Sequence, residues 1–224
     1  MATHLDLEEQ EQLDALKHFW NQWGNLITWV LIAVLGAYAA WNGWQYWERR
    51  QAGLASALYD EVDRAAQAGD VARVERALAD MKDKYGGTTY AAHAGLLGAK
   101  VLAGKDKPTE AKAALAWVAD KAPSDGLRAV ARLRLASVQI GEKAYDDALS
   151  TLSASFPAQY TALVADRRGD VLLLQGKRAE AATEFGKAYQ GLTAEAGDYR
   201  RLVGMKLNAL GIDPDAGAKA GATS

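Results

Sequence analysis

The hydrophobic pattern divides the chain into two parts. Between Phe19 and Trp47 no side chain is charged, and apolar residues fill most of the middle of that stretch. From residue 48 to residue 210, apolar positions instead recur every three to four residues, and no segment alternates with the period of a β-strand. The pattern predicts an all-α chain in which one continuous apolar helix precedes a helical domain.

The uncharged stretch predicts a single transmembrane helix over residues 23–47. An α-helix of this length slightly exceeds the hydrocarbon core of a bilayer, which is about 30 Å thick. Indole rings favour the membrane–water interfaces, and Trp residues gather toward both ends of the stretch. The expected interface anchors are Trp20, Trp23, Trp41, Trp44 and Trp47.

Two alternatives to a membrane anchor are a buried core helix and a cleaved signal peptide. So long a stretch without charge is typical of spans and not of core helices. Ala37-Tyr38-Ala39 matches a cleavage signal, but the apolar run continues beyond it. A signal peptide also begins with basic residues, whereas residues 1–22 carry five acidic side chains and one Lys. An uncleaved signal anchor is favoured.

The helical domain contains two interleaved series of helix-stop residues with nearly the same period. The first series is Gly69, Gly104, Gly141 and Gly176, at intervals of 35, 37 and 35 residues. The second series is Gly86, Pro123, Pro157 and Gly191, at intervals of 37, 34 and 34 residues. Each Gly of the first series is expected to end a helix with a positive φ. Together they predict a helix–turn–helix unit repeated about four times, as in tetratricopeptide arrays.

A packing pattern inside each unit supports the repeat. A small or branched residue is followed four positions later, on the same helix face, by a large apolar one. The four pairs are Val74 and Leu78, Ala111 and Leu115, Ala148 and Leu152, and Ala181 and Phe185. An ordinary Ala-rich helical bundle is the alternative, which the double series of stops disfavours. The predicted fold is a solenoid of antiparallel helix pairs.

The predicted domain organisation has four parts. Residues 1–22 form an acidic N-terminal segment and residues 23–47 the transmembrane helix. Residues 48–210 form the repeat domain, whose last helix, from about Asp198 to Leu210, caps the open end of the stack. Residues 211–224 are rich in Ala and Gly and are expected to be disordered.

Composition argues against several kinds of chemistry. The mean hydropathy of −0.19 excludes a protein made mostly of membrane spans, and a formal charge of −2 gives no basic footprint for nucleic acid. The chain has no Cys, and His4, His18 and His93 lack a metal-ligand spacing. Asp166 and Asp170 lie one helical turn apart, but flanking arginines favour a solvated helix face over a catalytic pair. We expect no enzyme activity, no cofactor and no metal.

Stacked helix pairs usually bind peptides or proteins on the concave face formed by the first helix of each pair. The positions expected to face this groove are Leu133, Ser137, Ile140, Asp166, Asp170 and Leu173. This lining mixes apolar and acidic residues, and it lacks the Lys and Asn pattern of repeats that clamp a C-terminal carboxylate. It predicts adaptable contact with unfolded or helical segments of other proteins.

The charges beside the span give a weak prediction of orientation. Lys17 is the only basic residue before the span, whereas Arg49 and Arg50 follow it directly. The positive-inside rule therefore places the C-terminal domain in the cytoplasm, although long domains cross membranes largely regardless of charge.

The order of segments resembles the ancillary SecYEG translocon subunits of the YfgM type. The resemblance covers about residues 5–211, and a short acidic stretch, one span and a degenerate tetratricopeptide-like domain follow one another in both. The segments that carry it are Glu11–Trp20, Gly43–Trp47, Ala129–Ala136 and Val164–Asp170.

The resemblance implies a location and partners for the chain. The N-terminus would be cytoplasmic and the repeat domain periplasmic, in a bacterial inner membrane. The expected partners are the SecYEG translocon, a membrane-anchored periplasmic chaperone related to prolyl isomerases, and unfolded client proteins. The implied function is to hand newly translocated chains to periplasmic chaperones. A scaffold that organises another envelope or cell-division complex is the alternative.

Overall fold

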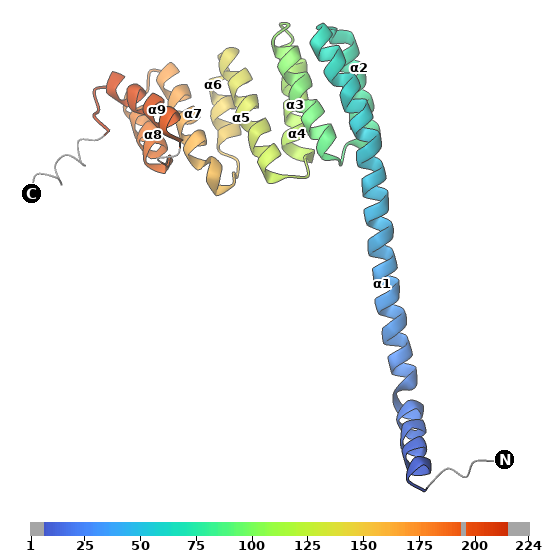
Figure 1. The fold of residues 1–224 in the computed structure, drawn as a ribbon. Coiled ribbons are helices and arrows are strands. Elements are labelled where there is room, and N and C mark those ends of the chain that lie inside the picture. The colour runs from blue at the N-terminus through green and yellow to red at the C-terminus, as the bar shows by residue number, and fades with distance from the viewer. Residues whose placement is uncertain (1–6, 194–195, 215–224) are drawn as a thin grey trace, which may run out of the picture. The chain divides into compact units, whose positions relative to one another are not determined.

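The computed structural model describes residues 7–193 and 196–214. Within these residues every regular element is a helix, which confirms the predicted all-α class (Figure 1). The elements are α1 (Leu7–Ala68), α2 (Val71–Tyr85), α3 (Thr89–Ala103), α4 (Pro108–Lys121), α5 (Asp125–Gly141), α6 (Tyr145–Leu152), the 3₁₀ helix η1 (Ala158–Tyr160), α7 (Thr161–Leu174), α8 (Arg178–Gly191) and α9 (Gly197–Ala209).

The chain forms two units, Met1–Gln51 and Ala52–Ser224, and α1 contributes residues to both. The predicted boundaries at residues 22, 47 and 210 stay predictions. Residues 215–224, most of the tail expected to be disordered, lie outside the described residues, as do residues 1–6 of the acidic segment.

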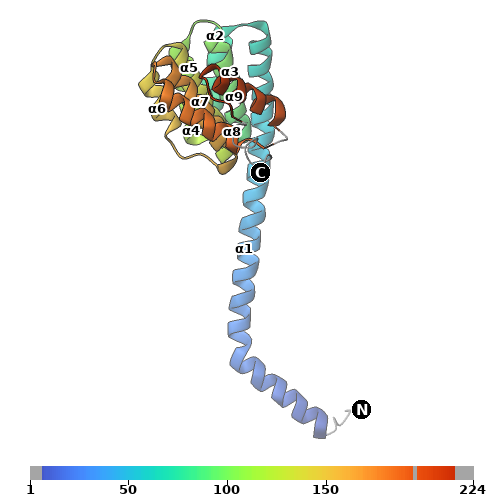
Figure 2. The same cartoon turned by 90° about the vertical axis from the view of Figure 1, so that its left-hand side faces the viewer.

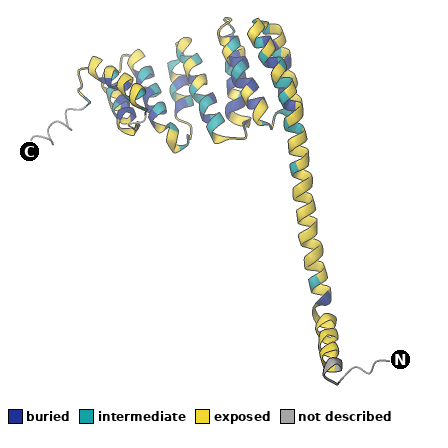
Figure 3. Cartoon of the chain, viewed as in Figure 1, coloured by how far each residue is buried: buried dark blue, intermediate teal, exposed yellow. Residues whose placement is uncertain are grey.

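The first unit holds a helix long and apolar enough to cross a membrane. Its most apolar 18-residue window has a mean hydropathy of 1.5, and only 6% of that window is buried. Figure 3 shows this part of α1 as almost wholly exposed. All five Trp residues expected as interface anchors are exposed. A core helix of a soluble domain would be mostly buried, so the exposure favours the transmembrane prediction.

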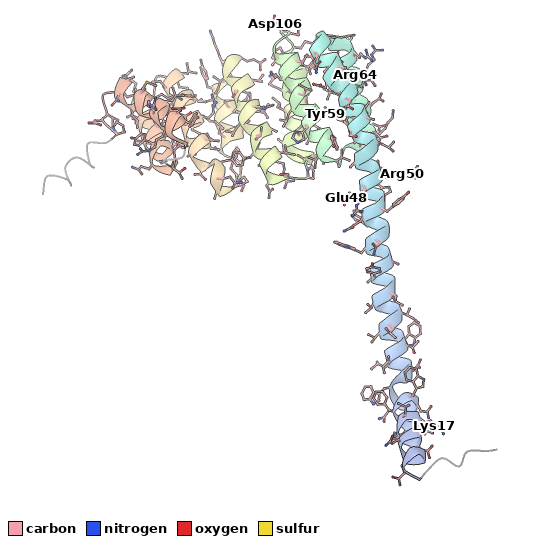
Figure 4. All side chains as sticks on the ribbon, viewed as in Figure 1. Lys17, Glu48, Arg50, Tyr59, Arg64 and Asp106 are labelled. Atoms are coloured by element: carbon pink, nitrogen blue, oxygen red, sulfur yellow. The ribbon has the colours of Figure 1, made fainter. Side chains whose placement is uncertain are left out.

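Charged residues bracket this apolar part of α1. Figure 4 shows Lys17 toward one end, and Glu48 and Arg50 at the other. The helix also bends within its N-terminal, dark-blue part (Figure 2). Within α1 the Thr28 hydroxyl donates to the Gly24 carbonyl oxygen at 2.7 Å, a bond of the kind that bends helices. The amphipathic N-terminal stretch is thus helical and continuous with the apolar part.

The second unit is a row of helix pairs, which lie side by side in chain order (Figure 1). The last part of α1 pairs with α2, and α3 with α4, α5 with α6, and α7 with α8 follow. Helix α9 ends the row. The predicted four pairs and capping helix are therefore confirmed.

The predicted packing pattern accounts for the core of this unit. Val74, Ala111, Ala148 and Ala181 have no exposed surface, and the large residue four positions after each is at most 4% exposed. Glycines allow the large residues to approach. A Cβ built on Gly169 would lie 2.6 Å from the Phe185 ring, and one on Gly98 would lie 2.2 Å from Leu78. The helices are therefore close because one of them lacks a side chain at the contact.

The turns within the four pairs share one backbone geometry. One residue has a positive φ, and the next backbone N–H donates to the carbonyl five residues earlier, as in a Schellman turn. The positive-φ residues are Gly69 (66°), Asp106 (55°), Lys143 (61°) and Gly176 (78°). Figure 4 shows Asp106 at the tip of the α3–α4 turn.

The expected positive φ at Gly104 and Gly141 is wrong. Gly104 has a φ of −73°, and Gly141 is the last residue of α5. In both pairs the positive φ falls two residues later, on Asp106 or Lys143. In all four pairs it precedes the buried small residue by five positions. The turn is therefore placed by the packing of the second helix and not by the glycine.

The third pair is incomplete, because α6 has 8 residues where α2, α4 and α8 have 14 or 15. An irregular segment and η1 follow α6 before α7 begins. Arg132 of α5 holds this segment by donating to the Ser155 carbonyl oxygen at 2.7 Å, and its guanidinium lies 5.9 Å from the Phe156 ring centre. The sequence predicted a stop at Pro157 but not this early end.

We predict that Lys143→Gly stabilises the chain. A left-handed φ costs an L-residue with a Cβ about 1–2 kcal/mol, and glycine removes that cost. Because glycine loses more backbone entropy on folding, the net gain is about 0.5–1 kcal/mol, or roughly 1–4 °C in melting temperature. Thermal unfolding of the full chain in detergent, followed by circular dichroism, measures it.

The matched control is Lys177→Gly. Lys177 occupies the last position of an equivalent turn but has a φ of −83°, so the substitution brings only the entropy cost and lowers the melting temperature. Equal shifts in the two variants would show that backbone strain at Lys143 plays no part.

Candidate functional site

The groove positions predicted on α5 lie in two environments. Leu133 and Ile140 are half-buried and pack against the core cluster that joins α5, α6 and α7. Ser137 is exposed, and its hydroxyl donates to the Leu133 carbonyl oxygen at 2.9 Å within the helix. Of these three residues, therefore, Ser137 offers the most surface to a partner.

Ser137 lies at a hollow of about 300 Å³ between α3 and α5. Ala99 and Ala103 of α3 line it from one side, and Lys100 and Arg134 are its charged residues. The Arg134 guanidinium donates to the Leu96 carbonyl oxygen at 3.4 Å. The charged lining of this hollow is therefore basic, in contrast to the partly acidic groove lining predicted from α7.

Asp166 and Asp170 of α7 are bound by the capping helix α9. Asp166 is only 2% exposed, and it accepts hydrogen bonds from the Tyr199 hydroxyl (2.6 Å) and from Lys206 Nζ (2.8 Å). Lys206 Nζ also donates to Asp170 Oδ1 at 2.6 Å. Arg167 lies near the other Asp170 oxygen, at 3.6 Å. One ammonium group thus bridges two carboxylates from successive turns of α7.

These contacts correct two expectations for Asp166. It does not lie on a solvated helix face, and it does not line a groove open to a partner, because α9 covers it and both of its oxygens are occupied. Asp170 is partly covered by the same helix, with 26% of its side chain exposed. At the end of α7, Leu173 is 36% exposed. The six predicted residues therefore do not form one open lining.

Burial governs the ionisation of this cluster. Burial raises the pKa of the Asp170 carboxyl above its ordinary value, and the hydrogen bond from Lys206 opposes the rise. Burial, followed by the hydrogen bond to Asp166, raises the pKa of the Tyr199 hydroxyl, so it remains a donor near neutral pH. The ionised form of Asp170 is therefore less favourable in the folded chain than in water.

Sequence reasoning missed Tyr199 and Lys206, which lie 33 and 40 positions after Asp166. A signal was present, because Tyr199, Val203 and Lys206 recur at helical spacing on the face of α9 that also carries buried Leu207. Lys206 also lies 5.0 Å from the centre of the Phe185 ring. The cluster therefore links α9 to both helices of the fourth pair.

No metal site is found among the side chains described, those of residues 11–193 and 196–214, since no three His, Asp or Glu side chains there gather closely enough to hold an ion. The predicted membrane anchors are a separate group, exposed along α1.

The architecture is that of a tetratricopeptide-like repeat protein with one candidate membrane span. The sequence model of a family described as a tetratricopeptide repeat-like domain matches residues 17–212. No solved structure is significantly similar to the chain.

Curated relatives narrow the class. A protein of Neisseria gonorrhoeae is 28% identical over 214 residues, which cover 94% of this chain and all of the relative. A protein of Escherichia coli K12 is 30% identical over 210 residues, which cover 91% of this chain and 97% of the relative. A protein of Haemophilus influenzae is 29% identical over 205 residues. All three are named ancillary SecYEG translocon subunit.

The chain belongs to the family of ancillary SecYEG translocon subunits, as the resemblance indicated. The relatives are a non-enzymatic kind of protein, and an inner-membrane protein with a single span fits both their name and the apolar part of α1.

We predict that Asp166→Asn lowers the free energy of unfolding by about 3 kcal/mol. The amide cannot accept from both Tyr199 and Lys206, so a buried donor loses its partner. Asp170→Asn, the same change one turn away, lowers the free energy of unfolding by less than about 1 kcal/mol. It removes a charge that burial already disfavours, and Lys206 keeps its hydrogen bond to Asp166.

Denaturant unfolding of the full chain in detergent compares the two variants. Hydrogen exchange adds a local measurement, in which Asp166→Asn accelerates exchange across residues 197–209. Similar losses in both variants, or unchanged protection of α9, would show that Asp166 does not hold the cap.

Proposed function

We propose that the chain is a membrane-anchored accessory subunit of the Sec translocon that passes newly translocated polypeptides to periplasmic chaperones. The observation that carries the proposal is the extent of the family match. It covers more than nine-tenths of this chain, including the apolar part of α1 and the helix pairs, and nearly all of each relative. The proposed partners are SecYEG, a membrane-anchored periplasmic prolyl-isomerase-like chaperone and unfolded clients.

The proposed mechanism is tethering. A span holds the repeat domain at the membrane, so a weak binding surface meets each emerging chain at a high effective concentration. Binding of this kind needs no reaction and no cofactor. It does need a surface that accepts many sequences, for which partly apolar hollows with a few charged groups are suited.

The proposed topology has a cytoplasmic N-terminus and a periplasmic repeat domain in a bacterial inner membrane. The charges oppose it weakly, because Arg49 and Arg50 follow the span and only Lys17 precedes it. The five acidic residues before Lys17 contribute little to that rule. We side with the family, since a bias of one or two charges is easily overridden in a chain with a long translocated domain.

We predict that alkaline phosphatase fused to the C-terminus of the full chain is active, because this enzyme folds only in the periplasm. The same enzyme fused to the N-terminus is the control and stays inactive. Green fluorescence from a cytoplasm-dependent reporter at the C-terminus would contradict the proposal. It would favour a cytoplasmic scaffold that organises another envelope or cell-division complex.

The hollow around Ser137 is the proposed contact surface for clients on the concave face. Its lining is mostly apolar, with Ala99, Ala103 and Val138 beside Ser137. Leu133, Ile140 and Leu173 do not line this hollow. The acidic positions predicted with them no longer belong to this surface, because α9 occupies them.

We predict that a photo-crosslinker attached at Ser137→Cys captures newly translocated chains. The chain has no Cys, so one introduced thiol is the only attachment point. Ser150→Cys is the matched control, since Ser150 is also exposed but lies on α6, the second helix of its pair. Several-fold stronger crosslinking at position 137 is expected, and equal yields would exclude a client groove there.

A further inference from the structure

A second cavity lies at one end of the α7–α8 pair, away from the Ser137 hollow. It has a volume of about 670 Å³ and is lined by η1, the first half of α7, the second half of α8, the segment after α8 and Tyr199. Its apolar walls include Ala162, Leu163, Ala165 and Leu192. A volume in this range is typical of small-ligand sites and can take a short peptide segment.

Three charged side chains of the described residues line the cavity, those of Arg168, Glu184 and Lys187. Glu184 is 8% exposed, and its Oε1 accepts from Lys187 Nζ at 2.6 Å. Arg168 Nε lies 3.9 Å from Glu184 Oε2, which is too far for a hydrogen bond. This Nε has no hydrogen-bond partner and is itself shielded from solvent, whereas 41% of the Arg168 side chain is exposed and can be reached from the cavity. Among the described residues, the charged lining therefore consists of two cations and one acid.

The unpaired N–H of Arg168 indicates what the cavity lacks. A buried donor without an acceptor costs free energy, and such groups are rare in folded proteins. Glu184 cannot satisfy it in this arrangement, because its carboxylate is drawn to Lys187. An arginine binds a carboxylate through parallel hydrogen bonds better than any other side chain does. The apolar walls beside it favour a ligand whose carboxylate lies next to apolar groups.

We propose that this cavity binds a short peptide segment in which one acidic side chain lies beside apolar ones, with the carboxylate on Arg168. The choice of a side chain over a C-terminal carboxylate rests on the proposed function. Internal segments of a translocating client emerge before its C-terminus, so a site that receives emerging chains meets side chains first. The cavity would therefore select among client segments, whereas the Ser137 hollow supplies general apolar contact.

Peptide binding to the purified full chain in detergent tests the proposal. The probe is a fluorescent peptide of Leu and Ala with one central Glu and both ends capped, and its counterpart has Gln in place of Glu. Fluorescence anisotropy should show about tenfold tighter binding of the Glu peptide, the value of one hydrogen bond to a charged group. In Arg168→Gln both peptides should bind as the Gln peptide binds the unmodified chain.

Arg201→Gln is the matched control, because Arg201 is 75% exposed and pairs with Asp198 on the surface of α9. It should keep the preference for Glu. Equal binding of both peptides to the unmodified chain, or a preference that persists in Arg168→Gln, would overturn the proposal. Tighter binding that is found only for a Gln peptide with a free C-terminus would show that the cavity binds a C-terminal carboxylate. It would overturn the proposal that an acidic side chain is bound.

A second variant is available if Arg168→Gln is unstable. If circular dichroism shows that Arg168→Gln does not fold, Lys187→Gln removes the other, 60% exposed cation and should reduce the preference for Glu. An undiminished preference in that variant would count against the cavity. The peptide measurement also does not depend on topology, so a cytoplasmic repeat domain would refute the proposed function while leaving binding at Arg168 intact.

Discussion

The close approach of neighbouring helices is the constraint on which the repeat domain depends. Large side chains of one helix pack on glycines of a neighbouring helix, as Phe185 packs on Gly169 and Leu78 packs on Gly98. A small or branched residue lies four positions before each of these large ones and is fully buried. Such small–large pairs recur at intervals of 37, 37 and 33 residues, and the positive-φ residue of each turn keeps the same intervals. Core and turns therefore follow one register, and even a Lys adopts a left-handed φ where the register demands it.

Contacts between neighbouring helix pairs hold the array together, and the last helix has a neighbour on one side only. Here ion pairs help to attach that last helix. Helix α9 has no further pair to pack against, and two of its large apolar side chains, Leu202 and Met205, remain exposed. Its attachment uses Val203 and Leu207 together with Lys206, which bridges Asp166 and Asp170. Buried charges are tolerated only when they are paired, so the carboxylates of Asp166 and Asp170 on α7 require the ammonium group that α9 supplies.

What could be predicted from the sequence was what depends on local pattern. The four buried residue pairs and the capping helix follow from apolar positions three to four residues apart, the period follows from the spacing of the Gly and Pro stops, and the apolar stretch of α1 follows from local composition. The environment of Asp166 depends on partners 33 and 40 positions away, and local charge pointed to solvent instead. The early end of α6 likewise depends on a tertiary contact, that of Arg132 with the segment after it. Glycines were a good signal for turns in general and a poor one for the residue with a positive φ.

The use of acidic residues links these contacts to the surfaces proposed for clients. In the fourth pair, Asp166, Asp170 and Glu184 all form ion pairs inside the chain, with Lys206 or Lys187. The charged residues of the Ser137 hollow are Lys100 and Arg134, and the α7–α8 cavity adds Arg168. A chain whose formal charge is −2 thus has two partly apolar hollows in which cations outnumber acids among the described lining residues. Because Lys206 pairs with Asp166 and Asp170, and Lys187 pairs with Glu184, none of these three acids is left without a cation to oppose a carboxylate at Arg168.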